Sequence, residues 1–243
     1  MKNLQNNVFN MFEFDNSQKQ EISPLEINLN NFKYIIGTDE AGRGPAAGGV
    51  WAAAVCFFEN VDRNLFLKLN DSKKLNHKTR EELFDLIVQN SYFSIQVSNV
   101  SKIEQMNILN ASLEAMKKAV YKVSLKLKEK SILTLVDGNR LIKNFDFPQK
   151  TIVKGDSISA SIAAASILAK VARDRYMERI DKICPNYDWK NNKGYLSKKH
   201  IEAIKEFGPS KFHRFSFLKN ILEEKTKKTK TPQGLNKSKR WGE

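Results

Sequence analysis

The sequence predicts an α/β fold in which helices flank a mixed sheet. Short apolar runs with strand character come first along the chain, and strands alternate with helices after them. Two longer segments, one after Ser101 with a single apolar face and one Ala-rich over residues 158–180, are predicted to be helices that pack on such a sheet. With 243 residues, 41% of them hydrophobic, the chain is long enough for one large domain or two small ones. Strands followed by strand–helix alternation are typical of a layered α/β domain.

The first 32 residues are predicted to form a flexible polar extension, because they are rich in Asn, Gln, Glu and Ser. An apolar cluster that begins at Val8 and includes Phe12 gives the segment a means of docking on the domain. Chain ends are often poorly ordered, so we expect a loosely packed end. The segment lacks the apolar core of a secretory signal peptide.

Two buried strands are predicted on either side of a glycine-rich break. Residues 32–38 form a short apolar run, and residues 49–58 form a second one that is apolar on both faces. The break contains Gly42 and Gly44. A third strand is predicted near residues 92–97.

Two helices are predicted in the middle of the chain. Asn76 is a suitable N-cap for a helix that runs to about Gln89. Ser101 and Glu104 have the S-x-x-E spacing of a capping box for the next helix. That helix has one apolar face, made by Leu109, Leu113, Met116, Val120, Val123 and Leu127.

The second half of the chain predicts two short strands and an Ala-rich helix. Residues 131–136 and 151–154 are the strands. Asp156 or Ser157 then caps a helix over residues 158–180.

We expect residues 33–222 to form one domain, with a helical and irregular portion from about residue 184. Residues 223–243 are expected to form a basic flexible tail, with seven basic and three acidic side chains. The whole chain has a formal net charge of +14, so about +10 remains on the body. Such a surplus favours a polyanionic partner, with nucleic acid the first candidate and an anionic membrane surface the second.

The two cysteines, Cys56 and Cys184, give no disulfide framework and no zinc-ligand spacing. We therefore expect a protein of the reducing cytoplasm. No apolar run reaches the roughly 18 residues that span a bilayer, so no membrane segment is expected.

Four acidic residues lie where predicted strands end or a helix begins. Asp39 and Glu40 close the first strand, Asp137 closes a later one, and Asp156 follows another. Ligands bind at such strand ends in α/β sheets, and neighbouring strands would bring the four carboxylates together. Gathered carboxylates stay ionised only if cations compensate them, and Mg²⁺ or Mn²⁺ suits oxygen ligands. Two such ions, roughly 4 Å apart, can activate a water and stabilise the leaving oxygen of a phosphodiester.

The alternative for any one of these acids is a turn or cap role, and for Asp137 and Asp156 taken alone that role is the favoured one. Only the set of four carries the argument. Neighbouring residues of a regular strand face opposite sides. Asp39 and Glu40 therefore face one site only if the strand ends or bulges there, which the following glycines allow.

Candidate nucleic-acid contacts lie in several segments. In the G-R-G loop, the glycine amides and the Arg43 guanidinium can bind a phosphate or sugar. The two lysines of the D-S-K-K-L segment precede a predicted helix and can bind phosphates. The Tyr195 ring can stack on a sugar or base. Each is a weak signal alone. A tight turn also explains the G-R-G loop, a polar loop explains the lysines equally well, and a structural role is the usual one for such a Tyr. His213 and Arg214 are either phosphate contacts or ordinary surface. The full set is Gly42, Arg43, Gly44, Ser72, Lys73, Lys74, Lys154, Tyr195, His213 and Arg214.

Several ordered blocks over about residues 33–218 resemble ribonuclease HII, the bacterial type 2 RNase H family. The blocks are Y-I-I-G-T-D-E-A-G-R-G-P-A-A-G-G-V-W-A-A-A-V from residue 34, D-S-K-K-L from 71, N-I-L-N-A-S-L-E-A-M from 107, V-D-G-N from 136, K-G-D from 154, S-I-A-A-A-S-I-L-A-K-V-A-R-D-R from 161, G-Y-L-S-K-K-H from 194 and F-G-P-S-K-F-H-R-F-S-F from 207. The intact G-R-G and the short N-terminal extension argue against the related type HIII enzymes.

The resemblance implies an RNase H-like, mixed five-stranded sheet flanked by helices, with a C-terminal helical portion. It implies a monomer that hydrolyses RNA in RNA·DNA hybrids and incises 5′ of single ribonucleotides in duplex DNA with two divalent ions. By motif matching, the metal-binding carboxylates are Asp39, Glu40, Asp137 and Asp156. The G-R-G loop then senses the ribose 2′-OH, the one group that distinguishes RNA from DNA at a given nucleotide. Tyr195 matches the ring that stacks on the adjacent deoxyribose.

Two other functions are weighed against the nuclease. A non-catalytic nucleic-acid-binding protein of this fold would be expected to lack at least one of the four acids, and all four are present. A membrane-surface protein would need an amphipathic helix with a basic face, and the Lys-rich tail lacks that apolar spacing.

Overall fold

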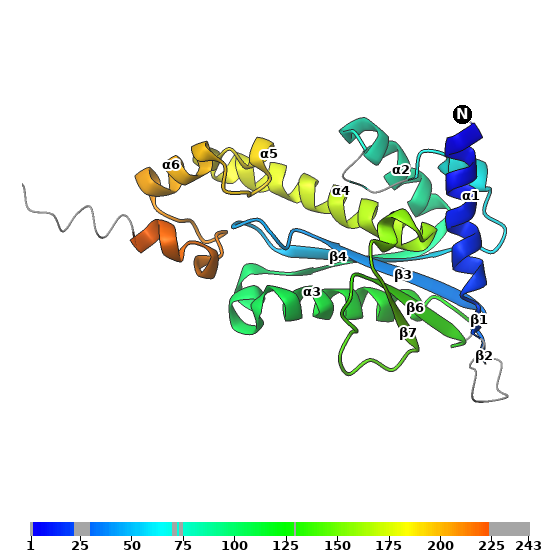
Figure 1. The fold of residues 1–243 in the computed structure, drawn as a ribbon. Coiled ribbons are helices and arrows are strands. Elements are labelled where there is room, and N and C mark those ends of the chain that lie inside the picture. Colours follow the sequence, from blue (N-terminus) through cyan, green and yellow to red (C-terminus); the bar gives the residue numbers. More distant parts are fainter. Residues whose placement is uncertain (1, 22–29, 70–71, 73–74, 129, 224–243) are drawn as a thin grey trace, which may run out of the picture.

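A five-stranded mixed sheet between helices forms the body of the molecule (Figure 1). The computed structural model describes residues 2–21, 30–69, 72, 75–128 and 130–223. Across the sheet the strands are β5 (Ser91–Ser98), β4 (Val50–Phe57), β3 (Tyr34–Ala41), β6 (Ile132–Asp137) and β7 (Gln149–Ile152). The predicted α/β class is confirmed, with each of the five predicted strands present within a few residues of its expected range.

The central strand β3 joins an antiparallel half of the sheet to a parallel half. It pairs antiparallel with β4, which pairs antiparallel with β5, and it pairs parallel with β6, which pairs parallel with β7. In the β3–β6 register, Thr38 lies opposite Val136. The next residue on each strand is an aspartate, so the parallel pairing places Asp39 beside Asp137 at one edge of the sheet.

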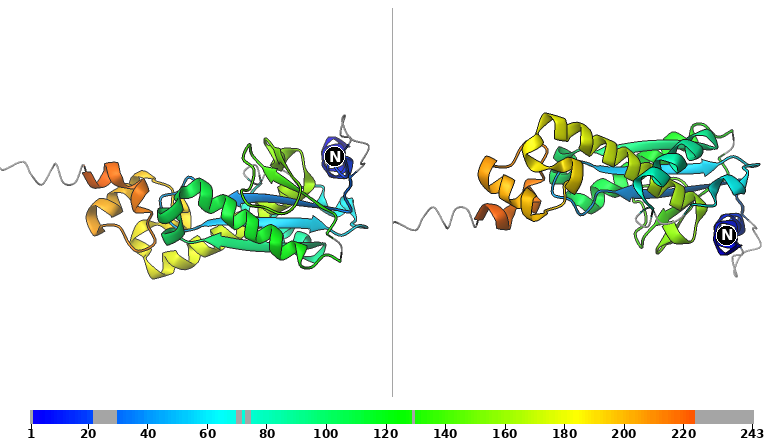
Figure 2. Two further views of the ribbon diagram at one scale, coloured as in Figure 1. Left: turned by 90° about the horizontal axis from the view of Figure 1, so that it is seen from below. Right: turned by 90° about the horizontal axis from the view of Figure 1, so that it is seen from above.

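Helices cover both faces of the sheet. Helix α4 (Ala160–Ile183) crosses one face, with α2 (His77–Gln89) packed beside it, and α3 (Val100–Ser124) crosses the other (Figures 1 and 2). Because side chains alternate along a strand, Ala53 and Val55 of β4 pack with α4, whereas Ala54 packs with α3.

Helix α4 begins in very close contact with β3. A Cβ atom placed on Gly37 would lie 2.3 Å from the backbone nitrogen of Ile162. Only glycine permits this approach, and it fixes the first turn of α4 over the centre of the sheet.

The C-terminal portion is helical, as predicted, and has its own small core at one end of the sheet (Figure 1). Its elements are η3 (Pro185–Tyr187), α5 (Trp189–Asn192), α6 (Lys198–Phe207) and η4 (Phe215–Phe217). Trp189, Ile204 and Leu218 are buried together with Met177 from the end of α4. The last turns of α4 therefore anchor this portion to the sheet.

The N-terminal cap predicted for α2 is confirmed, and the one predicted for α3 is not. The Asn76 side chain accepts a hydrogen bond from the Thr79 amide and caps α2, as predicted. The capping box on Ser101 and Glu104 is wrong. Asn99 caps α3 instead, and Glu104 accepts hydrogen bonds from Ser216 in the C-terminal portion.

The predicted cap of α4 is also wrong. A short 3₁₀ turn, η2 (Gly155–Ser157), contains both candidates, Asp156 and Ser157. The helix starts later, and the Ser159 hydroxyl accepts the hydrogen bond of the Ile162 amide. Asp156 therefore lies in a separate turn before α4 and not at the N-terminus of the helix.

The helix of the N-terminal segment is packed against the domain, contrary to the prediction of a loose end. Helix α1 (Lys2–Ser17) lies across one end of the sheet (Figure 1). Val8, Met11 and Phe12 are buried against the core that contains the start of α4. Their three- and four-residue spacing makes one apolar helix face. A short antiparallel pair, β1 (Gln20–Glu21) with β2 (Asn30–Asn31), follows α1.

In the part of the chain that the structure describes, no helix is both long and apolar enough to cross a membrane. Cys56 and Cys184 are both free thiols. The predicted basic tail lies outside the described residues, apart from Glu223.

Candidate active site

A cavity of about 650 Å³ opens at the edge of the sheet where β3 and β6 end. Three of the four predicted carboxylates line it, Asp39, Glu40 and Asp137. The Gly42–Gly44 loop and the Tyr195 ring line it as well. One cavity therefore contains both acids and candidate nucleic-acid contacts, although they are up to 156 residues apart in sequence.

Asp39 and Glu40 reach this cavity from opposite faces of β3. The β3–β4 pairing continues without interruption from Gly37 to Ala41, so the suggested bulge is wrong. Asp39 lies on the α4 side, where it hydrogen-bonds Ser166. Glu40 also lines a second, smaller cavity of about 230 Å³ together with α3 side chains such as Ser112. The cavity lies at the end of the strand, where both faces are accessible.

Glu40 and Asp137 place two negative charges close to the buried Asp39 carboxylate. Asp39 is only 5% exposed. Its pKa is raised well above 3.8, first by burial and then by the negative charges of Glu40 and Asp137. Arg43 offsets part of this charge, with its Nη1 3.3 Å from Glu40 Oε1. A cation bound between the acids would relieve the rest and keep Asp39 ionised.

Asp156 is not among the described residues that line the cavity, so the structure brings three of the four acids together and leaves the fourth beside them. Asp137 Oδ1 accepts a 2.7 Å hydrogen bond from the amide of Gly155, the residue before Asp156. Within the described residues, no three His, Cys, Asp or Glu side chains are arranged to hold one metal ion. Mg²⁺ characteristically takes only one or two protein carboxylates and completes its shell with water and phosphate oxygens, so this donor set suits it.

Two buried arginines, Arg173 and Arg214, lie against the Gly42–Gly44 loop. The Arg214 guanidinium donates to the carbonyl oxygens of Gly42, Arg43 and Gly48, at 2.7, 3.0 and 2.8 Å. A Cβ atom on Gly42, whose φ is +100°, would lie 2.1 Å from Nε of Arg173. The loop conformation therefore depends on glycine at this position.

His213 and Arg214 are not surface contacts, which corrects the prediction made for them. Both are fully buried. His213 hydrogen-bonds Ser210 and the buried His200. Burial, with a smaller contribution from His200, lowers the pKa of His213 to about 4, so the ring is neutral at physiological pH. Arg214 supports the Gly42–Gly44 loop, and His213 forms a β-bridge with Ala47 and belongs to the buried core of the C-terminal portion.

The other predicted nucleic-acid contacts differ in exposure and in the residues they touch. Tyr195 is 54% exposed and lies over the loop, since a Cβ atom on Gly44 would be 3.3 Å from its ring. Ser72 is buried and hydrogen-bonds Ser166, so it orients a neighbour of Asp39. Lys154 is exposed next to η2. Lys73 and Lys74 lie outside the described residues.

Comparison with known proteins decides the family. The family model described as ribonuclease HII matches residues 36–220. The chain belongs to the ribonuclease HII family. Family members are endoribonucleases that act on the RNA of RNA–DNA hybrids, and this is the activity of the chain. The resemblance noted in the sequence is thereby confirmed.

Individual relatives agree with this assignment. A ribonuclease HII from Fusobacterium nucleatum is 47% identical over 209 residues, which cover 86% of this chain and 96% of the relative. Among solved structures, the ribonuclease H2 of Pyrococcus horikoshii OT3 is 25% identical with a TM-score of 0.64, covering 80% of this chain and 99% of that one. Bst-RNase HIII in complex with Mn²⁺ has the same fold, with a TM-score of 0.61 at 18% identity over 80% of this chain and 70% of its own.

The cavity also contains residues that the motif analysis did not single out. Ser166, Lys170 and Arg173 of α4 all line the cavity. Lys170 Nζ lies 2.7 Å from Asp174 Oδ1, and Arg80 of α2 lies 4.0 Å from the same carboxylate. The available signal was their spacing, because positions 166, 170 and 173 form one polar stripe on an otherwise Ala-rich helix.

Proposed function

We propose that this ribonuclease HII also incises on the 5′ side of single ribonucleotides in duplex DNA, and that it acts with two divalent ions, Mg²⁺ or Mn²⁺. The observation that carries the proposal is the shared cavity of Asp39, Glu40 and Asp137 beside the arginine-supported glycine loop. One half of this arrangement suits cations and the other half suits a sugar-phosphate backbone.

The carboxylates are the groups that would hold the ions. Asp39, Glu40 and Asp137 are the first ligands, and Asp156 joins them from the η2 turn, whose Gly155 is hydrogen-bonded to Asp137. Bound there, a pair of divalent ions supplies an activated water and charge stabilisation for the leaving oxygen. Mn²⁺ is the ion present in the Bst-RNase HIII structure. Burial, and after it the negative charges of Glu40 and Asp137, raise the pKa of Asp39, and bound cations would offset both effects.

Selection for RNA rests on the loop and the exposed tyrosine. Backbone groups of Gly42 and Gly44 approach a ribose closely because neither residue has a side chain, and Arg214 holds the loop in place. The 2′-OH is both donor and acceptor, so peptide groups can recognise it directly. Tyr195 offers an exposed ring on which the neighbouring sugar can pack. A deoxyribose suits this apolar surface because it has no 2′-OH that would be left without a hydrogen-bond partner there.

The net charge of +14 favours a nucleic-acid duplex as the partner. We place the catalytic unit at residues 33–222, with the protein acting as a monomer in the cytoplasm.

The decisive test of this function is a nicking assay on a DNA duplex that contains one ribonucleotide. With Mg²⁺ or Mn²⁺, the protein is expected to cut once, on the 5′ side of the ribonucleotide. An all-DNA duplex of the same sequence should stay intact, and an RNA·DNA hybrid serves as the control for family activity. Cleavage of the hybrid without nicking of the single-ribonucleotide duplex would reject the proposed substrate, and equal cutting of the all-DNA duplex would reject the selection mechanism.

A further inference from the structure

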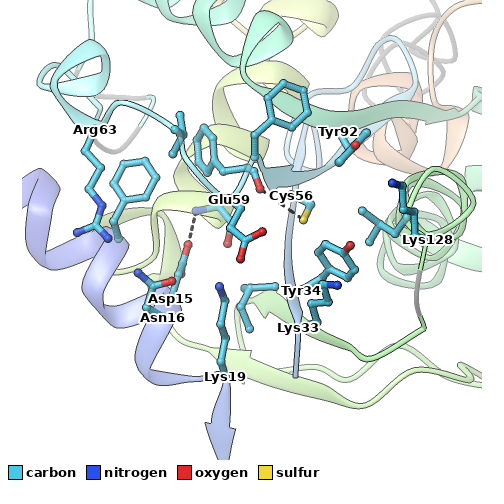
Figure 3. A pocket seen from close by; sticks show the side chains of 17 residues that line it. Asp15, Asn16, Lys19, Lys33, Tyr34, Cys56, Glu59, Arg63, Tyr92 and Lys128 are labelled. Atoms are coloured by element: carbon cyan, nitrogen blue, oxygen red, sulfur yellow. Dashed lines mark hydrogen bonds between the residues drawn. The ribbon is translucent and has the colours of Figure 1, made fainter. Parts of the chain in front are cut away.

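Helix α1 contributes a buried carboxylate that is not part of the catalytic site. Asp15 is 7% exposed and lies beside a cavity of about 430 Å³ between α1 and the far end of the sheet (Figure 3). Its Oδ1 accepts a hydrogen bond from the Ser159 hydroxyl at 2.5 Å, and its Oδ2 accepts one from the Ser161 amide at 2.8 Å. Asp15 therefore caps the start of α4 from another element of the chain.

The hydrogen bonds continue from this cap to the active site. The Ser159 amide donates to the Gly155 carbonyl oxygen at 2.8 Å. The Gly155 amide in turn donates to Asp137 Oδ1 at 2.7 Å. Two residues, Ser159 and Gly155, thus connect the Asp15 carboxylate of α1 to the Asp137 carboxylate of the cavity. Asp156 lies inside the span that this path fixes.

We propose that α1, acting through Asp15, is a positioning element that holds the η2 turn, and with it Asp137 and Asp156, in the geometry needed for metal binding. The part of the inference that concerns metal rests on the proposed function. Asp15 touches neither substrate nor ion, so it acts through Ser159 and Gly155. Because α1 lies before residues 36–220, the positioning element is outside the segment matched by the family model.

The charge of Asp15 makes it a strong cap. Burial raises its pKa to about 6, and the hydrogen bonds from Ser159 and Ser161 limit this rise. The carboxylate is therefore ionised at neutral pH. Hydrogen bonds to an ionised acceptor are stronger than neutral ones, and the positive end of the α4 dipole adds to them. Without the carboxylate, the amide of Ser161 would remain buried without this acceptor.

A simpler role for α1 is to stabilise the fold by covering apolar surface. Val8, on the same helix, is buried and packs in the core without any part in the hydrogen-bonded path. Val8→Ala is therefore the matched control, because it weakens the packing of α1 and leaves the cap intact.

The test compares Asp15→Ala with Val8→Ala in the full chain, at a temperature well below both melting points. Mn²⁺ binding to the substrate-free protein is followed by electron paramagnetic resonance, and steady-state cleavage of an RNA·DNA hybrid is measured in parallel. Asp15→Ala is expected to weaken Mn²⁺ binding about tenfold and to lower kcat about tenfold, with an unchanged KM for the hybrid. Val8→Ala is expected to match the wild type in all three.

The proposal is overturned if the two variants bind Mn²⁺ and turn over alike, whatever their melting temperatures. Should Asp15→Ala fail to fold, Asp15→Asn keeps one acceptor oxygen and is expected to show a smaller loss in the same direction. If the wild type itself bound no Mn²⁺, the proposed metal site would fail, whereas the kcat comparison on the hybrid would still decide whether Asp15 positions the active site.

Discussion

Replacing Asp137 by Asn is expected to abolish cleavage while the protein still binds its duplex. Asp137 lines the cavity with Asp39 and Glu40, and its Oδ1 is fixed by the Gly155 amide. Asparagine has nearly the same shape but lacks the negative charge that a divalent ion requires. Loss of ion-assisted water activation should reduce turnover by at least about a thousandfold, or roughly 4 kcal/mol of activation free energy.

Single-turnover cleavage and fluorescence anisotropy measure the two sides of this prediction. Duplex affinity should change by less than about threefold, because phosphate contacts depend on basic side chains. Glu59→Gln, an exposed carboxylate at the opposite end of the sheet, serves as the charge-matched control and should behave as the wild type. A parallel loss of binding and cleavage in Asp137→Asn would show that the residue is structural.

Adding a methyl group to Gly42 is expected to have the second largest effect. The Gly42 backbone has a φ of +100°, and a Cβ atom would lie 2.1 Å from Nε of the buried Arg173. Arg173 is held by the carbonyl oxygens of Ala47 and Lys193 and has little room to move. The loop must therefore shift, and Gly42→Ala should lower the rate on a single-ribonucleotide duplex by about a hundredfold, or roughly 3 kcal/mol.

Gly208→Ala separates this clash from backbone strain. Gly208 has a φ of +78° at the end of α6, but a Cβ atom there would meet nothing within 4 Å. We expect it to cost about 1 kcal/mol of unfolding free energy with unchanged activity, as strain alone would. Urea denaturation gives the stability of both variants, and nicking rates give their activity. Equal rates in the two variants would mean that the loop geometry does not govern selection of the ribonucleotide.

Strand positions and the proximity of Asp39 to Asp137 were predictable because the deciding physics is local or follows from the order of the strands. Strand β4 is buried on both faces, and the uninterrupted run of apolar residues over 49–58 predicts this burial. Asp39 and Asp137 follow apolar runs, and parallel pairing of those runs brings them together. The Asn76 cap depends only on residues within one helical turn.

The errors occur where a side chain's surroundings come from distant segments. His213 and Arg214 appear as surface charges in the sequence, yet they are buried under a loop more than 160 residues away. Glu104 has the spacing of a capping residue but binds Ser216 instead. The apolar positions of α1 were visible, but nothing local indicates that Asp15 meets the start of α4. Burial and partner choice at these positions are tertiary properties.

The most direct test of the two-ion site is anomalous diffraction from crystals of the protein with an uncleaved, phosphorothioate-substituted RNA·DNA hybrid and Mn²⁺. Two Mn²⁺ peaks roughly 4 Å apart are expected between the scissile phosphate and the carboxylates of Asp39, Glu40, Asp137 and Asp156. A map with bound hybrid but with no Mn²⁺ among these four side chains, or with only one ion there, would contradict the proposed mechanism.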